Sequence, residues 1–334
     1  MGATVSIFTP VYNSEKYIEE CIQSVLNQTF SDFDWYIYDD GSKDNSYYIC
    51  EKYSQMDSRI HLSHGENGEC IDRMNDFMLN AKGKYIAFID NDDYWETNYL
   101  KKMIDAIENT DSDCVISSYK LVDSEGNFLE WYTPNLKNRE LLTCDELKKR
   151  FLTTLDIEGF RWNKIYKTKI IRQSNVKIKN IFPADVNFEY SLFKYVDKIV
   201  TIDSKGYYYR QSPNSEVATF SIEKCKSMLG TYERVGNCAI SEGYKTEGEY
   251  FKAWRYINYL FNNVIKRTLT DDEVLDIFSS FPWDKMVSYS LIELFPKVLF
   301  YNEKKNGNAK FMIKALLVWK RWLSYRRRVK LNEQ

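Results

Sequence analysis

Three carboxylates stand within four positions at Asp90, Asp92 and Asp93, directly after the apolar run Tyr85–Ile89. A run of this kind is typical of a buried strand, so the acids would lie at its carboxyl end. Like charges this close repel and raise each other's pKa, so a positive partner is expected. A divalent cation that also holds a phosphate would supply it, because hard cations prefer oxygen ligands. On this stretch alone, a solvated acidic turn is the alternative.

Two further polar clusters follow predicted strands in the same way. Val5–Thr9 predicts a strand that stops at Pro10 and leads into Thr9–Asn13, and Trp35–Tyr38 predicts one that leads into Asp39–Ser42. Amphipathic helices are expected between the strands, near 18–26, 46–56 and 70–81. This alternation predicts an α/β fold with a mostly parallel central sheet and helices on both faces, and ligands bind at the carboxyl edge of such sheets.

Composition excludes several classes of protein. The net charge of −2 over 334 residues argues against a generally basic nucleic-acid binder. Seven cysteines without close pairs suggest neither a disulfide framework nor a zinc site, and two histidines leave acid and base chemistry to carboxylates. Glycine-rich dinucleotide and P-loop motifs are absent after the first predicted strand. A phosphate-bearing ligand would therefore need another partner, and a metal on the acidic cluster is the candidate.

The chain shows no signal-peptide pattern at its start and no run of 18 apolar residues. We therefore expect a cytoplasmic protein. Its length favours two domains, which we place at residues 1–220 and 221–334, the second composed of helices.

Five segments together resemble the nucleotide-sugar half of a family 2 glycosyltransferase with the GT-A fold. They are Val5–Asn13 with Gln28–Phe30, Asp39–Ser46, Glu66–Gly68 and Ala81–Asp93. The resemblance implies an inverting enzyme that moves a sugar from a UDP-sugar or dTDP-sugar to an acceptor hydroxyl, with Mn²⁺ or Mg²⁺ at the diphosphate. It also implies a bacterial polysaccharide, of a capsule or cell wall, or a lipid-linked glycan precursor as the acceptor.

The same resemblance assigns roles to individual residues of this chain. The side chains that would meet the nucleotide are Pro10, Tyr12, Asp40, Asn67, Asp90 and Asn91. Tyr12 would offer a ring face to the base, and Asp40 would accept a hydrogen bond from it. Asp92 would be the principal metal ligand, with Asp93 as its neighbour or second ligand.

One position departs from the family pattern. Many relatives carry Ala-Arg-Asn on the helix after the Glu66–Gly68 turn, whereas this chain has Arg73-Met74-Asn75, which displaces the arginine by one residue. A displacement of one residue turns a helical side chain by about 100°. Arg73 is therefore either a diphosphate contact or a surface arginine.

An inverting transfer needs a general base for the acceptor hydroxyl, and a carboxylate suits that role. The segments Trp162–Lys167 and Phe182–Phe188 resemble the acceptor side of polysaccharide-making relatives, which carry a Glu-Asp pair. Asp185 matches the Asp, whereas Ala184 replaces the Glu. Asp185 is thus the predicted base and Glu189 the reserve, and the alternative for Asp185 is a helix N-cap.

Tyr207–Arg210 also matches a family segment that approaches the diphosphate. Arg210 could neutralise phosphate charge. The alternative is that the tyrosines pack the sheet, which we favour for at least two of them.

The segment 309–330 predicts a basic helix with interleaved Trp and Leu and no acid between Lys310 and Lys330. Such a helix can bind an anionic membrane surface, which would place the protein peripherally at the inner face of the membrane. The alternative is a core or homodimer helix with a solvated basic tail.

Two rival functions remain open from the sequence. A sugar nucleotidyltransferase also uses a carboxylate pair on an α/β sheet, although it would carry a glycine-rich basic loop after its first strand. A transferase-like nucleotide-binding module without catalysis would explain the displaced Arg73 and the Ala184 replacement.

Overall fold

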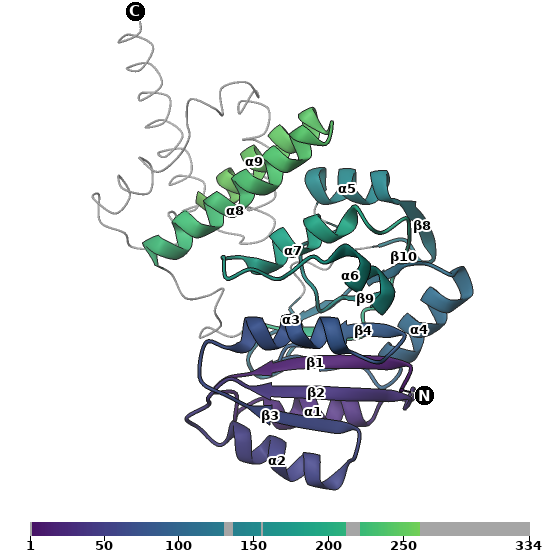
Figure 1. Cartoon of the computed structure of the whole chain (residues 1–334), viewed down its shortest axis with the longest axis vertical. Coiled ribbons are helices and arrows are strands. Elements are labelled where there is room, and N and C mark those ends of the chain that lie inside the picture. Colours follow the sequence, from purple (N-terminus) through teal and green to yellow (C-terminus); the bar gives the residue numbers. More distant parts are fainter. Residues whose placement is uncertain (1, 130–135, 155, 212–220, 261–334) are drawn as a thin grey trace, which may run out of the picture. The chain divides into compact units, whose positions relative to one another are not determined.

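The structure, a computed structural model, describes residues 2–129, 136–154, 156–211 and 221–260 (Figure 1). The chain divides into two compact units, residues 1–219 and residues 220 onward. The first unit combines a large sheet with helices on both of its faces, which confirms the predicted α/β class.

The main sheet has eight strands in the order β3-β2-β1-β4-β9-β6-β10-β8. Their bounds are β1 Val5–Val11, β2 Phe33–Asp39, β3 Ile60–His64, β4 Tyr85–Phe88, β6 Cys114–Ser117, β8 Glu140–Thr143, β9 Lys164–Lys167 and β10 Lys198–Ile202. The ladders β3-β2, β2-β1, β1-β4 and β6-β10 are parallel. Only β9 and β8 run against the other six strands. The sheet is therefore mostly parallel, as predicted.

Strand β9 was not predicted from the sequence, and its direction determines where the segment before it lies. It lies between β4 and β6, antiparallel to both, with Ile165 opposite Ala87 and Lys164 opposite Ile116. Because it runs in the opposite direction, its start lies beside the ends of β4 and β6. Residues 158–163, just before β9, are thereby brought to the carboxyl edge of the sheet.

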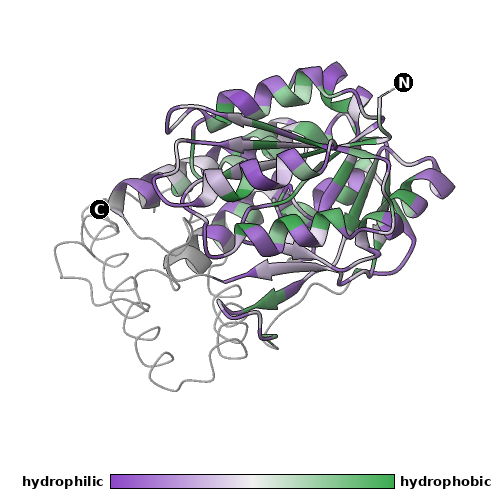
Figure 2. Cartoon of the chain, turned by 90° about the horizontal axis from the view of Figure 1, so that it is seen from below, coloured by the Kyte–Doolittle hydropathy of each residue, from purple (hydrophilic) through white to green (hydrophobic). Residues whose placement is uncertain are grey.

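Seven helices of the first unit accompany the sheet. Their bounds are α1 Ile18–Leu26, α2 Ser46–Met56, α3 Cys70–Asn80, α4 Tyr99–Thr110, α5 Cys144–Thr153, α6 Thr168–Ser174 and α7 Ala184–Phe193. Figure 2 shows apolar colouring concentrated in the strands and polar colouring along much of the helices. The buried face of α1 consists of Ile18, Cys21, Ile22 and Val25, the residues whose spacing predicted that helix.

The first strand is longer than predicted, because β1 continues through Pro10 to Val11. The ladder with β4 ends at Phe8, whereas the ladder with β2 continues to Val11. Beyond Phe8 the strand is paired on one side only, and proline is tolerated on a strand with an open side. The expectation that Pro10 ends the strand was therefore wrong.

A second, three-stranded sheet has the order β5-β11-β7 and joins Tyr94–Trp95, Tyr207–Arg210 and Lys120–Val122. Tyr207 is completely buried, and the ring of Tyr208 stacks on that of Tyr94 at 4.5 Å between centroids. The packing interpretation of these two tyrosines is confirmed.

In the second unit, α8 (Ile222–Ser241) and α9 (Lys245–Leu260) are the described helices, and they pack against each other. None of the helices in the described ranges is both long and apolar enough to cross a membrane. The predicted basic helix at 309–330 lies outside the described residues. Its contact with a membrane or with a second copy of the chain stays a prediction.

Gln28 joins α1 to the segment that follows the acidic loop. Its side chain, only 5% exposed with the rest of the residue, donates to the carbonyls of Ser24 and Glu96 and accepts from the amide of Leu100. Replacement by alanine leaves the buried amide of Leu100 without its acceptor and removes one of two donors from the Glu96 carbonyl, which keeps the amide of Tyr99. We expect Gln28→Ala to lower the free energy of unfolding by about 1–3 kcal/mol, measured by urea denaturation.

Gln23→Ala is the matched control, because Gln23 lies on the exposed side of the same helix and its amide donates only to the Tyr53 hydroxyl. Its effect should stay within about 0.5 kcal/mol. Equal losses for the two variants would contradict the bridging role of Gln28.

Candidate active site at the carboxyl edge of the sheet

The loops that follow β1 and β2 meet, as the sequence predicts for neighbouring parallel strands. The backbone amide of Asn13 donates to the Ser42 hydroxyl at 3.0 Å, and the Asn13 side chain accepts from the amide of Lys43 at 2.8 Å. Asn13 has a φ of 47°, a left-handed conformation that asparagine tolerates better than most residues. The predicted convergence of Thr9–Asn13 with Asp39–Ser42 is therefore confirmed.

Asp40 joins this edge to the turn that contains Asn67. Its carboxylate accepts from the amides of Gly68 and Glu69 at 2.9 and 3.0 Å. Gly41 has a φ of +79°, and a Cβ there would lie 2.9 Å from the amide nitrogen of Asn67, so only glycine allows this approach. Asn67 itself is exposed. The structure thus brings Asp40 and Asn67 together and leaves the Asn67 side chain open to a ligand.

Asn91 lies against the end of β1. Its side-chain amide donates to the carbonyl of Pro10 at 2.7 Å, so these two predicted nucleotide residues are in direct contact. Tyr12, two residues further along, is 45% exposed. Its ring is available to a stacked base at this edge, the position that its predicted role requires.

The acidic loop is built around a buried carboxylate. Asp93 is 1% exposed, and its two oxygens accept from the Tyr207 hydroxyl at 2.6 Å and from the amide of Arg210 at 2.8 Å. Burial, together with the charges of Asp92 and Asp90, raises the pKa of Asp93 well above its ordinary range. Because both oxygens already bind protein donors, Asp93 has a structural role and does not fit the predicted second metal ligand.

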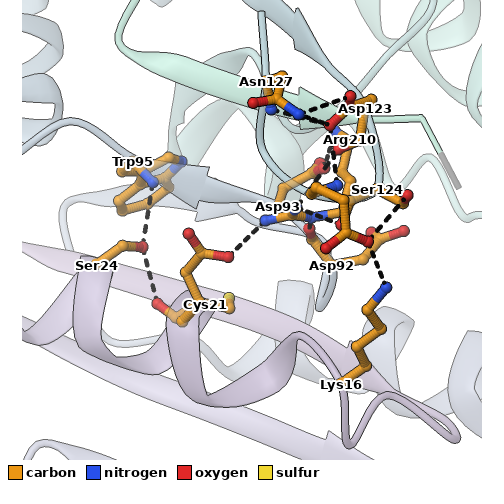
Figure 3. A network of polar contacts seen from close by, with 12 residues as sticks. Lys16, Cys21, Ser24, Asp92, Asp93, Trp95, Asp123, Ser124, Asn127 and Arg210 are labelled. Carbon is orange, nitrogen blue, oxygen red and sulfur yellow. Dashed lines mark hydrogen bonds and ion pairs between the residues drawn. The ribbon is translucent and has the colours of Figure 1, made fainter.

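The side chain of Arg210 also binds the acidic loop (Figure 3). Its Nε donates to the carbonyl of Asp92 at 2.8 Å, its Nη1 donates to the carbonyl of Ser124 at 3.1 Å, and its Nη2 contacts the carboxylate of Glu20 at 2.5 Å. The guanidinium also lies over the ring of Tyr17, 4.6 Å from its centroid. These contacts occupy the donors that a phosphate would need, so the predicted role of Arg210 at the phosphate is not supported.

Asp92 is the carboxylate of this loop that fits a cation. Burial raises its pKa, and the nearby charge of Arg210 opposes that rise. A partly buried carboxylate with a raised pKa is stabilised as an anion by an added positive charge. Within the described ranges, no group of three or more His, Cys, Asp or Glu side chains could hold a metal by itself. A cation here would share its coordination between Asp92 and oxygens of the ligand.

Arg73 is found on the exposed face of α3. Its Nη2 contacts the Glu69 carboxylate at 3.2 Å, and the guanidinium lies 5.8 Å from the centroid of the Tyr38 ring. The Tyr38 hydroxyl also donates to Glu69 at 3.1 Å. Both interpretations of Arg73 remain compatible with this position, since the pair with Glu69 is half exposed.

Asp185, the predicted base, forms an ion pair with Arg161. The N-cap of α7 is Pro183, so Asp185 lies inside the first turn and the N-cap alternative was wrong. Glu189, the reserve candidate, is completely buried, and it accepts from the Tyr166 hydroxyl and lies 3.8 Å from Lys164 Nζ. Burial raises its pKa to about 7. A carboxylate so enclosed cannot meet an acceptor.

Cys70, the first residue of α3, is a partly buried thiol. Burial and the charges of Asp40 and Asp90 raise the pKa of its thiol to about 12, while the charge of Arg161 opposes the rise. Arg161 was missed in the sequence, where only its place just before Trp162–Lys167 could have indicated it.

Comparison with known proteins agrees with this geometry. Residues 6–180 match the sequence model of glycosyl transferase family 2. The uncharacterized glycosyltransferase EpsJ of Bacillus subtilis (strain 168) is 30% identical over 215 residues, which are 63% of this chain and 62% of EpsJ. The chain therefore spans somewhat less than two thirds of that relative.

Solved structures share the fold. The crystal structure of TarS residues 1–349 from S. aureus in complex with UDP-GlcNAc has a TM-score of 0.67 at 19% identity, covering 93% of this chain and 90% of that one. The mannosyltransferase PcManGT of Pyrobaculum calidifontis in complex with GDP-Man and Mn²⁺ has a TM-score of 0.52 at 10% identity, covering 95% and 87% of the two chains. At these identities the likeness concerns the fold.

The Tyr207 hydroxyl serves both ends of the acidic loop, because it donates to Asp93 and accepts from the amide of Asp90 at 3.3 Å. Tyr207→Phe leaves a buried carboxylate oxygen without its donor. We expect the free energy of unfolding to fall by about 1–3 kcal/mol in urea denaturation.

Tyr208→Phe is the control from the same strand, since its partly exposed hydroxyl contacts only Lys120 at 3.2 Å. It should change stability by no more than about 0.5 kcal/mol. A Tyr207→Phe variant as stable as this control would contradict the bracing role of Tyr207.

Proposed function

The chain belongs to glycosyl transferase family 2, and from that premise we propose that it transfers a sugar from UDP-sugar or dTDP-sugar to an acceptor hydroxyl with inversion at the anomeric carbon. The acceptor is a bacterial surface polysaccharide or a lipid-linked glycan precursor. The observation that carries the proposal is the convergence of the segments after β1, β2 and β4, through the contacts of Asn13 with Ser42 and of Asn91 with Pro10. Ligands bind at this carboxyl edge in α/β sheets, which supports a donor site here.

The donor side is the stronger part of the proposal. Asp40 and Asn91 are each fixed by hydrogen bonds at the ends of β2 and β1, and the Tyr12 ring is exposed beside them. A rigid acceptor next to an open aromatic face suits a nucleobase. TarS, which shares the fold, binds UDP and UDP-GlcNAc in its crystal structures, and this supports a uridine nucleotide as the ligand here.

Mn²⁺ or Mg²⁺ is the proposed cofactor, with Asp92 as its protein ligand and Asp93 as the carboxylate that keeps the loop in place. The raised pKa of Asp92 fits this assignment, because the group lacks a full counter-charge of its own. PcManGT, of the same fold, was solved with Mn²⁺. When bound, the cation would supply positive charge to the departing diphosphate.

The proposed chemistry is a single displacement. A bond forms between the acceptor oxygen and the anomeric carbon as the bond from that carbon to the diphosphate oxygen breaks with its electron pair. Asp185 takes the acceptor proton, because it is 25% exposed while Asp93 and Glu189 are enclosed.

The donor assignment predicts metal-dependent stabilisation by a nucleotide. UDP with Mn²⁺ should raise the thermal midpoint of the wild-type chain, with about 2.7 kcal/mol of stabilisation at a hundredfold excess over Kd. Asp92→Asn should lose the metal-dependent part of that rise. Differential scanning fluorimetry with UDP, dTDP and GDP, each with and without Mn²⁺, measures both effects.

Asp76→Asn is the control for lost charge, because Asp76 is exposed on α3. It should respond to UDP and Mn²⁺ like the wild type. No response of the wild type to any nucleotide would contradict the proposed function, and an undiminished metal effect in Asp92→Asn would contradict the ligand assignment alone.

The base assignment predicts that Asp185→Asn lowers donor turnover about 10²–10⁴-fold while UDP affinity stays within about twofold. Slow hydrolysis of the donor measures turnover without a known acceptor. Asp156→Asn removes the acid from a similar ion pair, that of Arg150, and should keep most of the activity. Retained turnover in Asp185→Asn would remove Asp185 from the role.

A further inference from the structure

Arg161 is a charged residue that stands between the two halves of the candidate site. Its side chain is 13% exposed and contacts the Asp185 carboxylate through Nη1. The guanidinium also lies over the Phe88 ring, 5.7 Å from its centroid, at the end of β4 and two residues before Asp90. Arg161 therefore lies against β4, the strand before the acidic loop, and also contacts α7, the helix that carries the predicted base.

The segment 158–161 that carries Arg161 is fixed by a buried lysine. Lys164 is completely buried, and its Nζ donates to the carbonyls of Glu158 and Phe160 at 2.8 and 2.5 Å and to the Asn163 side chain at 3.0 Å. The nearby carboxylate of Glu189 balances its charge at 3.8 Å. A lysine is rarely buried without such partners, so this set of contacts orders the backbone just before Arg161.

Gly159 lets the same segment lie directly against α7. A Cβ at this position would stand 2.9 Å from the Cα and the Cγ2 of Val186, the residue after Asp185. Only a residue without a side chain permits this approach. Close packing at Gly159 and the contacts of Lys164 together hold Arg161 in reach of Asp185.

One polar atom of Arg161 is left over. Its Nε is buried and has no hydrogen-bond partner among the described residues. An unpaired buried donor costs about 1–3 kcal/mol, so an arginine serving stability alone would be a poor choice at this place. The unpaired Nε of Arg161 instead indicates that this side chain has a role in the reaction.

We propose that Arg161 is the positioning residue of the base, which orients the Asp185 carboxylate toward the acceptor. The inference rests on the proposed function, and it adds a residue that the family resemblance did not assign. The titratable groups near the pair are Glu189 on α7, Lys164 at the start of β9 and Cys70 on α3. Arg161 is the residue that contacts the Asp185 carboxylate.

The test compares donor hydrolysis by the full chain carrying Arg161→Ala, Arg161→Lys or Asp185→Asn. Arg161→Ala removes the ion pair that fixes the orientation of the Asp185 carboxylate. We therefore expect kcat to fall at least about tenfold while the donor KM stays within about twofold.

Arg161→Lys should restore part of the lost kcat, because it restores a positive charge without the planar guanidinium. Arg150→Ala is the matched control. Arg150 pairs with Asp156 and Glu140 at a comparable exposure of 22%, so its loss should lower stability without lowering kcat. If Arg161→Ala acted only by destabilising the fold, its thermal midpoint would fall and Arg150→Ala would lose activity to the same extent.

Each outcome decides the proposal. A wild-type kcat in Arg161→Ala, beside an inactive Asp185→Asn, would overturn the positioning role and leave the proposed function intact. A raised donor KM with an unchanged kcat would also overturn it, because Arg161 would then serve the donor. Full turnover in Asp185→Asn would contradict the base assignment itself, and the inference with it.

Discussion

The burial of Asp93 is the constraint on which the rest of the site depends. A carboxylate that is almost fully enclosed, next to Asp90 and Asp92, must be held by strong donors or it would take up a proton. The chain meets this demand with residues about 115 positions away, the Tyr207 hydroxyl and the Arg210 amide. Arg210 then ties in the segment near Ser124 and helix α1 through Glu20. The loop that presents Asp92 therefore keeps its shape because three separate parts of the first unit, β11, the segment near Ser124 and α1, are joined around it.

Two arginines serve opposite ends of this edge, Arg210 with a side chain 2% exposed and Arg161 with one 13% exposed. The donors of Arg210 go to protein carbonyls and to Glu20, so it acts as a brace for the acidic loop. Arg161 has one strong contact, with Asp185, and an Nε that no described group accepts. The two arginines thus differ in how many of their N–H donors are hydrogen-bonded. This difference separates structural from functional arginines better than burial does, since buried donors without partners are rare where stability alone decides.

Short-range signals in the sequence predicted the donor half well. Alternating strands and helices, with polar residues after each strand, placed Thr9–Asn13, Asp39–Ser42 and the acidic loop on one edge, and hydrogen bonds such as Asn13 to Ser42 and Asn91 to Pro10 show that they meet there. The role of Arg210 could not be foreseen, because its partners are distant in sequence and its charge equally suits a phosphate. Strand β9 was missed for a similar reason, since four buried residues reading Lys-Ile-Tyr-Lys show no apolar run. Arg161 depends on β9, and so it was missed as well.

The place of β9 has a consequence for how the first unit folds. The entirely buried strand β4 pairs with β1 on one side. Its partner on the other side is β9, which lies about 80 residues later in the chain. Until that segment has been synthesised, β4 presents an open apolar edge, the kind of surface on which strands of other chains add and aggregate. The family-matched region is thus not a self-sufficient folding module when it is cut before β9. Closure of the sheet and arrival of the Arg161 segment at the site are one and the same late event.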